Sequence, residues 1–145
     1  MKQYSCTFFG HSDCPNDIRP QLCKAITDLI VNKNVNTFYV GNNGQYDSMV
    51  RSVIRELQTV YPQIRYAVVL AYLPVKQTEV GKRYDDSMLP DGIENVPRRF
   101  AISWRNDWML EHSDYVITYV THSWGGAAQF AAKSEKKGKK VIHIR

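Results

Sequence analysis

The chain has 145 residues, of which 43% are hydrophobic and 23% charged, with a formal net charge of +5, so we expect one folded domain over residues 1–145. No apolar run is long enough to span a membrane, the start lacks a signal-peptide pattern, and three cysteines without a close pair predict neither a disulfide framework nor a metal site. Because much of the positive charge lies near the C-terminus and is not interleaved with aromatic residues, we do not expect nucleic acid as a partner.

The first half of the chain alternates strand and helix patterns. Residues 4–9 form a strand-like run, and apolar residues then recur at helical spacing from 18 to 29. Residues 37–40 predict a second strand, and apolar residues at helical spacing predict a helix over 50–57. Residues 65–72 are nearly all apolar, which is typical of a parallel strand covered on both faces.

Residues 73–97 interrupt this alternation, because proline, glycine and charged residues are scattered there without a period. We expect a long irregular loop with one helical turn at most. Four of its residues are apolar and unfavourable in water: Tyr84, Met88, Leu89 and Ile93. The loop is therefore either a lid that packs these residues when a ligand binds, with Arg98 or Arg99 contacting the ligand, or a static surface excursion.

The second half resumes the alternation. Helices are predicted over 100–112 and 125–137, and strands over 114–120 and 140–144. Strands that alternate with helices predict parallel βαβ units, and hence a three-layer Rossmann-like α/β sandwich with a parallel sheet of about five strands. In the strand order 3-2-1-4-5, the direction of winding reverses between the first and fourth strands.

Three polar turns that contain or adjoin glycines would meet at this reversal. They follow the first, second and fourth strands and comprise residues 10–13, 41–44 and 121–124. Open α/β sheets bind ligands in the crevice outside the carboxyl ends of such strands. Gly125 and Gly126 open the last helix, and backbone N–H groups at a helix start form a seat for phosphate. The expected ligand is therefore a nucleotide.

The candidate site residues divide by expected role. Ser123 would cap the helix whose amides at Gly125 and Gly126 seat the phosphate, and Arg105 would add a bidentate clamp on the same anion. His122 would contact the phosphate or the base, and Gly44 would bind the ligand as part of its turn. The sugar or base would lie against five other turn residues: Gly10, His11, Gly41, Asn43 and Asp47. Plainer interpretations stay open, in which the glycines serve turns and packing, Asp47 caps a helix, and the histidines are exposed surface residues.

Three longer strings carry a family resemblance. They are Phe-Phe-Gly-His at 8–11, Tyr-Val-Gly-Asn-Asn-Gly-Gln-Tyr-Asp-Ser-Met-Val at 39–50, and Thr-His-Ser-Trp-Gly-Gly-Ala at 121–127. Together they resemble the SLOG superfamily, the Rossmann-like group that contains the lonely-guy cytokinin-activating phosphoribohydrolases and DNA-processing protein A. Nearly the whole chain fits, and it looks most like a small bacterial group within the superfamily. The resemblance implies a single SLOG-like nucleotide-binding domain.

The resemblance to the phosphoribohydrolases is closest at Arg105, Met109 and Asp114, whose spacing matches their arginine-methionine-aspartate pattern. The chain departs from them after the glycine pair. Their pair leads into a Gly-Thr-x-Glu segment with a catalytic glutamate, whereas Ala127 and Ala128 follow here. The resemblance therefore implies nucleotide binding, and the missing glutamate puts hydrolysis in doubt.

We expect a cytoplasmic protein that binds a nucleotide, or a derivative such as ADP-ribose or a signalling nucleotide, in a sensor or ligand-binding role, and we expect no cofactor. The alternative is an enzyme that cleaves or transfers at the N-glycosidic bond of a nucleotide, similar to the phosphoribohydrolases or deoxyribosyltransferases, with Asp47 or Glu94 as its carboxylate. Four aromatic residues offer apolar surface for a homodimer: Trp104, Trp108, Tyr115 and Phe130.

Overall fold

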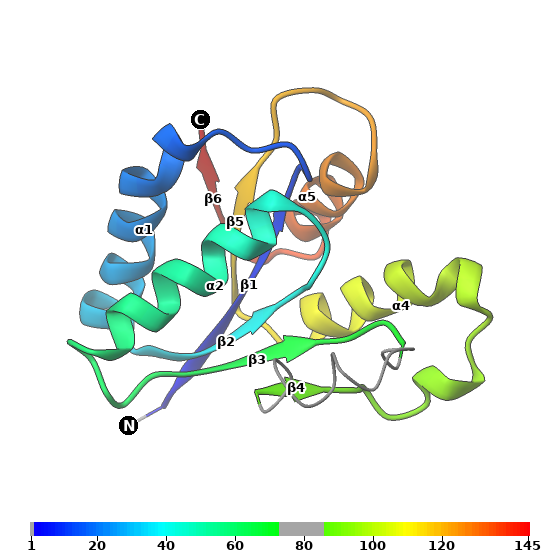
Figure 1. Ribbon diagram of the computed structural model, residues 1–145, viewed down its shortest axis with the longest axis horizontal. Coiled ribbons are helices and arrows are strands. Elements are labelled where there is room, and N and C mark those ends of the chain that lie inside the picture. The colour runs from blue at the N-terminus through cyan, green and yellow to red at the C-terminus, as the bar shows by residue number, and fades with distance from the viewer. Residues whose placement is uncertain (1, 73–85) are drawn as a thin grey trace.

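The computed structural model describes residues 2–72 and 86–145. They form a three-layer α/β sandwich around a six-stranded parallel sheet (Figure 1). The strands are β1 (Tyr4–Gly10), β2 (Val35–Val40), β3 (Arg65–Val69), β4 (Ser87–Met88), β5 (Tyr115–Tyr119) and β6 (Lys140–Ile144). Their order is β4-β3-β2-β1-β5-β6. The predicted fold class is confirmed, and the winding reverses between β1 and β5 as expected.

The sheet has six strands rather than five, because the short edge strand β4 lies in the segment that was predicted to be an irregular loop. Backbone hydrogen bonds join it to β3: Val68 N–H donates to the Asp86 carbonyl and Leu70 N–H to the Met88 carbonyl, each at 2.9 Å. A strand of two residues is too short to produce an alternating pattern, so this element depends on pairing that the local sequence does not reveal.

Residues 86–97, the described part of the same segment, pack against the rest of the domain. Met88 packs against the core cluster that contains Val69 and Met109, and Ile93 is buried in the short 3-10 turn η2 (Ile93–Asn95). The lid hypothesis thereby loses two of the apolar residues that motivated it. Tyr84, with the rest of residues 73–85, lies outside the described residues. Arg98 stacks over the ring of Tyr72, with its guanidinium carbon 4.0 Å from the ring centroid.

The helices follow the predicted apolar spacing. They are η1 (Asn16–Ile18), α1 (Arg19–Asn32), α2 (Gln45–Gln58), α4 (Arg98–Glu111) and α5 (Gly126–Lys136). Pro20 lies in the first turn of α1, where its missing N–H costs no helical hydrogen bond. The amphipathic helix α2 buries Val50, Val53, Ile54 and Leu57, as the periodicity predicts. Within the described residues, no helix has the length and apolar character needed to cross a bilayer.

Two hydrophobic cores lie on the two faces of the sheet. Helices α1 and α2 cover one face, and α4 and α5 cover the other (Figure 1). Successive side chains of β1 point to opposite faces, so Phe8 packs in the first core and Phe9 packs against Phe130 of α5 in the second. All residues of β5 are buried, because helices cover that strand from both sides.

The aromatic residues expected at a dimer surface do not all lie on the surface. Phe130 and Tyr115 belong to the two cores, whereas Trp104 and Trp108 are half-buried. The apolar side chains with high exposure are others: Val31, Val60, Tyr72, Phe100, Ile102 and Trp124. A homodimer stays a prediction, and any interface through α4 would have to use Trp104, Trp108 and their exposed neighbours.

Candidate functional site

The three predicted turns meet at the carboxyl edge of the central strands, because β1 pairs with both β2 and β5. Backbone contacts tie the turns together. His11 N–H donates to the Tyr119 carbonyl at 3.2 Å, and Gln45 N–H donates to the Ser12 carbonyl at 2.8 Å. The loop after β1 is therefore fixed on one side to the end of β5 and on the other to the start of α2.

A small cavity of about 100 Å³ lies at this edge, on the side of the sheet covered by α4 and α5. Five of the predicted site residues line it: Gly10, Asn43, Asp47, Arg105 and Gly126. The other residues in its wall were not predicted to contact a ligand, although Phe8, Phe9, Met109 and Ala127 belong to the patterns that carry the resemblance. The full set is Phe8, Phe9, Ile102, Asn106, Met109 and Ala127. The predicted convergence thus brings a carboxylate, an amide, a guanidinium and a helix start to one place.

Arg105 is buried, with 2% of its surface exposed, and is already engaged by the protein. Its Nη1 donates to the Val69 carbonyl at 2.9 Å and to Asn42 Oδ1 at 3.2 Å. Its Nη2 donates to Asn43 Oδ1 at 2.8 Å, and its Nε to Asn106 at 2.9 Å. Burial lowers the pKa of this guanidinium, and the charge of Asp47 partly offsets that effect. These hydrogen bonds hold Arg105 to the turn after β2, to the end of β3 and to its neighbour Asn106, rather than leaving it free for the bidentate clamp predicted on a ligand.

Asp47 takes part in the turn before α2 and also lines the cavity, and its contact with a sugar stays a prediction. Its Oδ2 accepts a hydrogen bond from Asn43 N–H at 3.0 Å, which stabilises the turn that leads into α2. It also lines the cavity, with 9% of its surface exposed. Burial raises the pKa of this carboxyl from 3.8 to about 6, although the Asn43 N–H bond and the charge of Arg105 act in the opposite direction.

Three of the predicted ligand-binding glycines have a packing role. A Cβ on Gly10 would lie 2.2 Å from the Tyr46 ring, and one on Gly41 would lie 2.7 Å from Asp47 Oδ2. Gly44 is the N-cap of α2 with a φ of 94°, and its Cβ would lie 2.5 Å from the Ser12 Cα atom. A side chain at any of these positions would force neighbouring atoms to move, so close packing is sufficient to explain the three glycines.

The contact of Gly10 gives a direct test. Changing Gly10 to alanine should lower the free energy of unfolding by about 1–3 kcal/mol, the usual cost of overpacking a core. Tyr46 is fully buried and its hydroxyl donates to the Ile117 carbonyl at 2.9 Å, so its ring has little room to move. Urea denaturation measures the loss. Gly126→Ala is the matched control, because a Cβ there meets no atom within 4 Å; equal stability of the two variants would contradict the packing role.

The start of α5 differs from the start of α2. At α2, the backbone N–H groups of Gln45 and Asn43 donate to Ser12 and Asp47. Among the described residues, the N–H groups of Gly126 and Ala127 at the start of α5 donate to no acceptor outside the helix, and both residues line the cavity. The N-cap is Gly125, with a φ of 92° and no side-chain cap. The prediction that Ser123 caps this helix is therefore wrong.

The two histidines lie against each other. The rings of His11 and His122 are stacked with centroids 3.7 Å apart and planes inclined by 18°. His11 is buried, and its Nε2 accepts a hydrogen bond from Thr121 N–H at 2.9 Å, so the ring is not the exposed residue that the plainer interpretation assumed. Burial, together with the nearby His122, lowers the pKa of His11. The His11 ring holds the turn after β5 through the hydrogen bond from Thr121 N–H.

Other candidate residues lie away from this cavity. Glu94 belongs to a separate cavity of about 200 Å³, next to Tyr72 and Arg98. The carboxylate of Asp114 accepts a hydrogen bond from Ser5 N–H at 3.1 Å, at the opposite edge of the sheet. Of the arginine-methionine-aspartate pattern, Arg105 and Met109 therefore line the cavity and Asp114 does not. Within the described residues, no group of three or more His, Cys, Asp or Glu side chains is placed to hold a metal ion.

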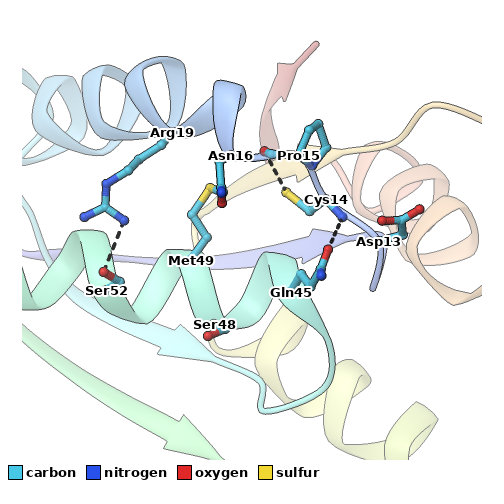
Figure 2. A pocket seen from close by; sticks show the side chains of 9 residues that line it. All are labelled: Asp13, Cys14, Pro15, Asn16, Arg19, Gln45, Ser48, Met49 and Ser52. Atoms are coloured by element: carbon cyan, nitrogen blue, oxygen red, sulfur yellow. Dashed lines mark hydrogen bonds between the residues drawn. The ribbon is translucent and has the colours of Figure 1, made fainter.

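A larger crevice of about 460 Å³ opens on the other face of the sheet, between the loop after β1 and α2 (Figure 2). Its polar groups hydrogen-bond to one another. Gln45 accepts from Cys14 N–H at 2.9 Å, and Arg19 donates to Ser52 at 3.1 Å and pairs with Glu56. The charge of Arg19 is thus compensated within the protein, which makes this crevice a poorer anion site than the start of α5.

Comparison with known proteins identifies structures that share the fold of this chain. No family model and no curated protein matches the sequence. DNA processing protein A from Streptococcus pneumoniae superposes with a TM-score of 0.68 and 12% identity, over 97% of this chain and 50% of that one. DNA processing protein A from Helicobacter pylori, described for its single-stranded DNA binding mode, superposes with a TM-score of 0.65 and 12% sequence identity. The match covers 97% of this chain and 64% of the Helicobacter pylori chain. They share the fold of this chain. The chain spans between half and two thirds of their length.

Proposed function

We propose that the chain is a SLOG-like domain that binds a nucleotide, or a nucleotide-derived ligand, at the cavity beneath α4 and α5. The observation that carries the proposal is the convergence of an uncompensated helix start with a buried aspartate at the carboxyl edge of a Rossmann-like sheet. The shared fold with two DNA processing proteins is consistent with a ligand site at this edge.

The start of α5 supports a phosphate group. Gly126 and Ala127 present backbone N–H groups next to the positive end of the helix dipole, where an anion is stabilised. Neither residue carries a side chain that would block the approach. Anion binding here needs no arginine clamp, which agrees with the engagement of Arg105 elsewhere.

Asn43 and Asp47 support the sugar. Because Arg105 holds the side-chain oxygen of Asn43, the amide nitrogen of Asn43 is directed away from that contact and can donate to a ligand oxygen. The second carboxylate oxygen of Asp47 accepts hydrogen bonds from hydroxyl groups, as a ribose requires. Arg105 thus orients the Asn43 side chain through a hydrogen bond, whereas it acts on Asp47 only through its charge.

Thermal-shift measurements with AMP, ATP and ADP-ribose test the proposal. A ligand at roughly 100 times its Kd adds about 2.7 kcal/mol of stability, which raises the Tm of a chain of this size by roughly 5–10 °C. Gly126→Asp places a carboxylate at the phosphate seat and should remove most of the shift. Ala132→Asp adds the same charge at an exposed position of α5 outside the cavity and should keep the shift. If Gly126→Asp binds as well as the wild type, the phosphate does not lie there.

Cleavage of an N-glycosidic bond is a second candidate, favoured by one observation. Asp47 is a buried carboxyl in the cavity, and burial raises its pKa to about 6. Catalytic carboxyl groups often have a raised pKa of this kind. Glu94 is not part of this candidate, because it lies in the separate cavity. Incubation with nucleoside monophosphates, followed by chromatography for free base, separates the candidates. Release that Asp47→Asn abolishes supports the enzyme; no release supports binding alone.

Single-stranded DNA is the ligand named for the Helicobacter pylori protein, and we do not propose it here. Two of the lysines that contribute to the net charge, Lys133 and Lys137, pair with Asp107 and Glu111, which reduces the positive surface along α5. A gel shift with oligothymidylate at low salt, weakening steeply as salt is added, would contradict this view.

A further inference from the structure

A column of three aromatic rings rises from the carboxyl edge of the sheet beside the start of α5. His11 lies at its base, His122 stacks on His11, and Trp124 stacks on His122 with centroids 3.9 Å apart and planes inclined by 19°. The column ends in an indole ring on a residue that is 69% exposed. Nothing in the packing of the core requires a tryptophan there, since its outer surface meets solvent.

The column is held in place from below. His11 is buried, and its backbone N–H donates to the Tyr119 carbonyl. The Nε2 atom of its ring accepts a hydrogen bond from the backbone N–H of Thr121 at 2.9 Å. An exposed tryptophan on a surface loop ordinarily keeps much of its rotational freedom. Here two rings beneath it fix the plane of the indole, so a flat group that stacks on its outer face loses little additional side-chain entropy in the protein.

Trp124 lies directly before the amides proposed to seat phosphate. Consecutive Cα atoms are 3.80 Å apart, so the Cα atoms of Trp124 and Gly126 are separated by no more than about 7.6 Å. A single ligand that places an anion on the start of α5 and a flat ring on the indole is therefore of mononucleotide size. Aromatic faces accept nucleobases by stacking, which does not depend on base identity.

We propose that Trp124 is the base-stacking subsite of this site, and that its occupant is the planar base of a free nucleotide whose phosphate lies on the amides of Gly126 and Ala127. The inference rests on the proposed nucleotide-binding function and adds the residue that distinguishes a nucleotide from a sugar phosphate. His122 supports the indole from behind and acts as a positioning residue.

Isothermal titration of the full chain with AMP and with ribose 5-phosphate tests the subsite. Trp124→Ala should weaken AMP binding by about 5- to 150-fold, the range for the loss of one base–aromatic stack. Trp124→Phe should retain most of the affinity. Ribose 5-phosphate has no base, so its affinity should be the same in the wild type and both variants. Phe100→Ala removes another exposed aromatic residue, on α4, and should leave AMP binding unchanged.

The other outcomes contradict the stacking subsite, and they show whether the proposed nucleotide-binding function fails with it. If Trp124→Ala weakens AMP and ribose 5-phosphate equally, the tryptophan only supports the shape of the loop. If AMP binds, Gly126→Asp abolishes binding and Trp124→Ala does not change it, the stacking is wrong and the proposed function stands. If the wild type binds no nucleotide, both fail. Trp124-dependent binding of oligothymidylate without binding of AMP would replace the free nucleotide with a nucleic-acid strand.

Discussion

Replacing Arg105 with methionine should lower the free energy of unfolding by about 1–3 kcal/mol at pH 7, the range for leaving a buried polar group without its hydrogen-bond partner. The guanidinium donates to the Val69 carbonyl and to the side chains of Asn42 and Asn43, all of which lose a partner in the variant. Because methionine has a comparable length, the loss reports missing hydrogen bonds and an uncompensated Asp47 rather than a large cavity.

Urea denaturation measures this loss, and two further variants identify its cause. Arg105→Lys keeps the positive charge but not the planar set of donors, so its stability should lie between the wild type and Arg105→Met. Combining Arg105→Met with Asp47→Asn removes the carboxylate whose charge Arg105 offsets, so the double variant should be more stable than the sum of the two single effects predicts. A loss below about 1 kcal/mol for Arg105→Met, typical of any point substitution, would contradict the organising role of this arginine.

The stability of the protein should depend on pH through Asp47. Its pKa is about 6 in the folded protein and 3.8 in the unfolded reference, so between these values the folded state binds the additional proton. The free energy of unfolding should therefore fall as the pH rises from about 4 to 6, and stay lower above that range. The difference of about two pKa units corresponds to about 3 kcal/mol.

Asp47→Asn isolates this effect, because asparagine resembles the protonated acid and its side-chain oxygen still accepts from Asn43 N–H. Urea denaturation curves from pH 4 to pH 7.5 should show the variant close to the wild type at pH 4 and more stable by up to about 3 kcal/mol at pH 7. Asp28→Asn on the exposed surface of α1 is the control and should keep the wild-type dependence. A wild-type profile without a fall between pH 4 and 6 would show that the pKa of Asp47 is not raised.

An aspartate that destabilises the folded protein at neutral pH supports a functional role for its position. Burial without full compensation is costly, and such residues gather where a ligand or a reaction requires them. Asp47 lies in the cavity at the reversal of the sheet, beside the amides of α5. The same substitution that stabilises the protein should therefore weaken nucleotide binding, because the carboxylate is lost as an acceptor for sugar hydroxyls.

The site was predictable in its location but not in the roles of its residues. Glycines and polar residues after the first, second and fourth strands indicated a common edge, and Gly10, Asn43, Asp47, Arg105 and Gly126 do share one cavity. The sequence cannot distinguish a glycine that opens space for a ligand from one that opens space for a neighbouring ring. That distinction depends on contacts between residues far apart in the chain, such as Gly10 with Tyr46.

The fold class follows from local patterns. Alternation of apolar strands with amphipathic helices requires parallel crossovers, and all five predicted strands and the helix periodicity of α2 are present. Tertiary structure alone decided the rest. The two-residue strand β4 exists because β3 offers it backbone partners, Arg105 is buried because the turn after β2 and the end of β3 supply acceptors, and Trp124 is stacked because two histidines from different turns meet beneath it. The periodicity of apolar residues indicates which side of a helix or strand is buried. Strand β4, the burial of Arg105 and the stacking of Trp124 depend instead on contacts between residues that are far apart in the sequence.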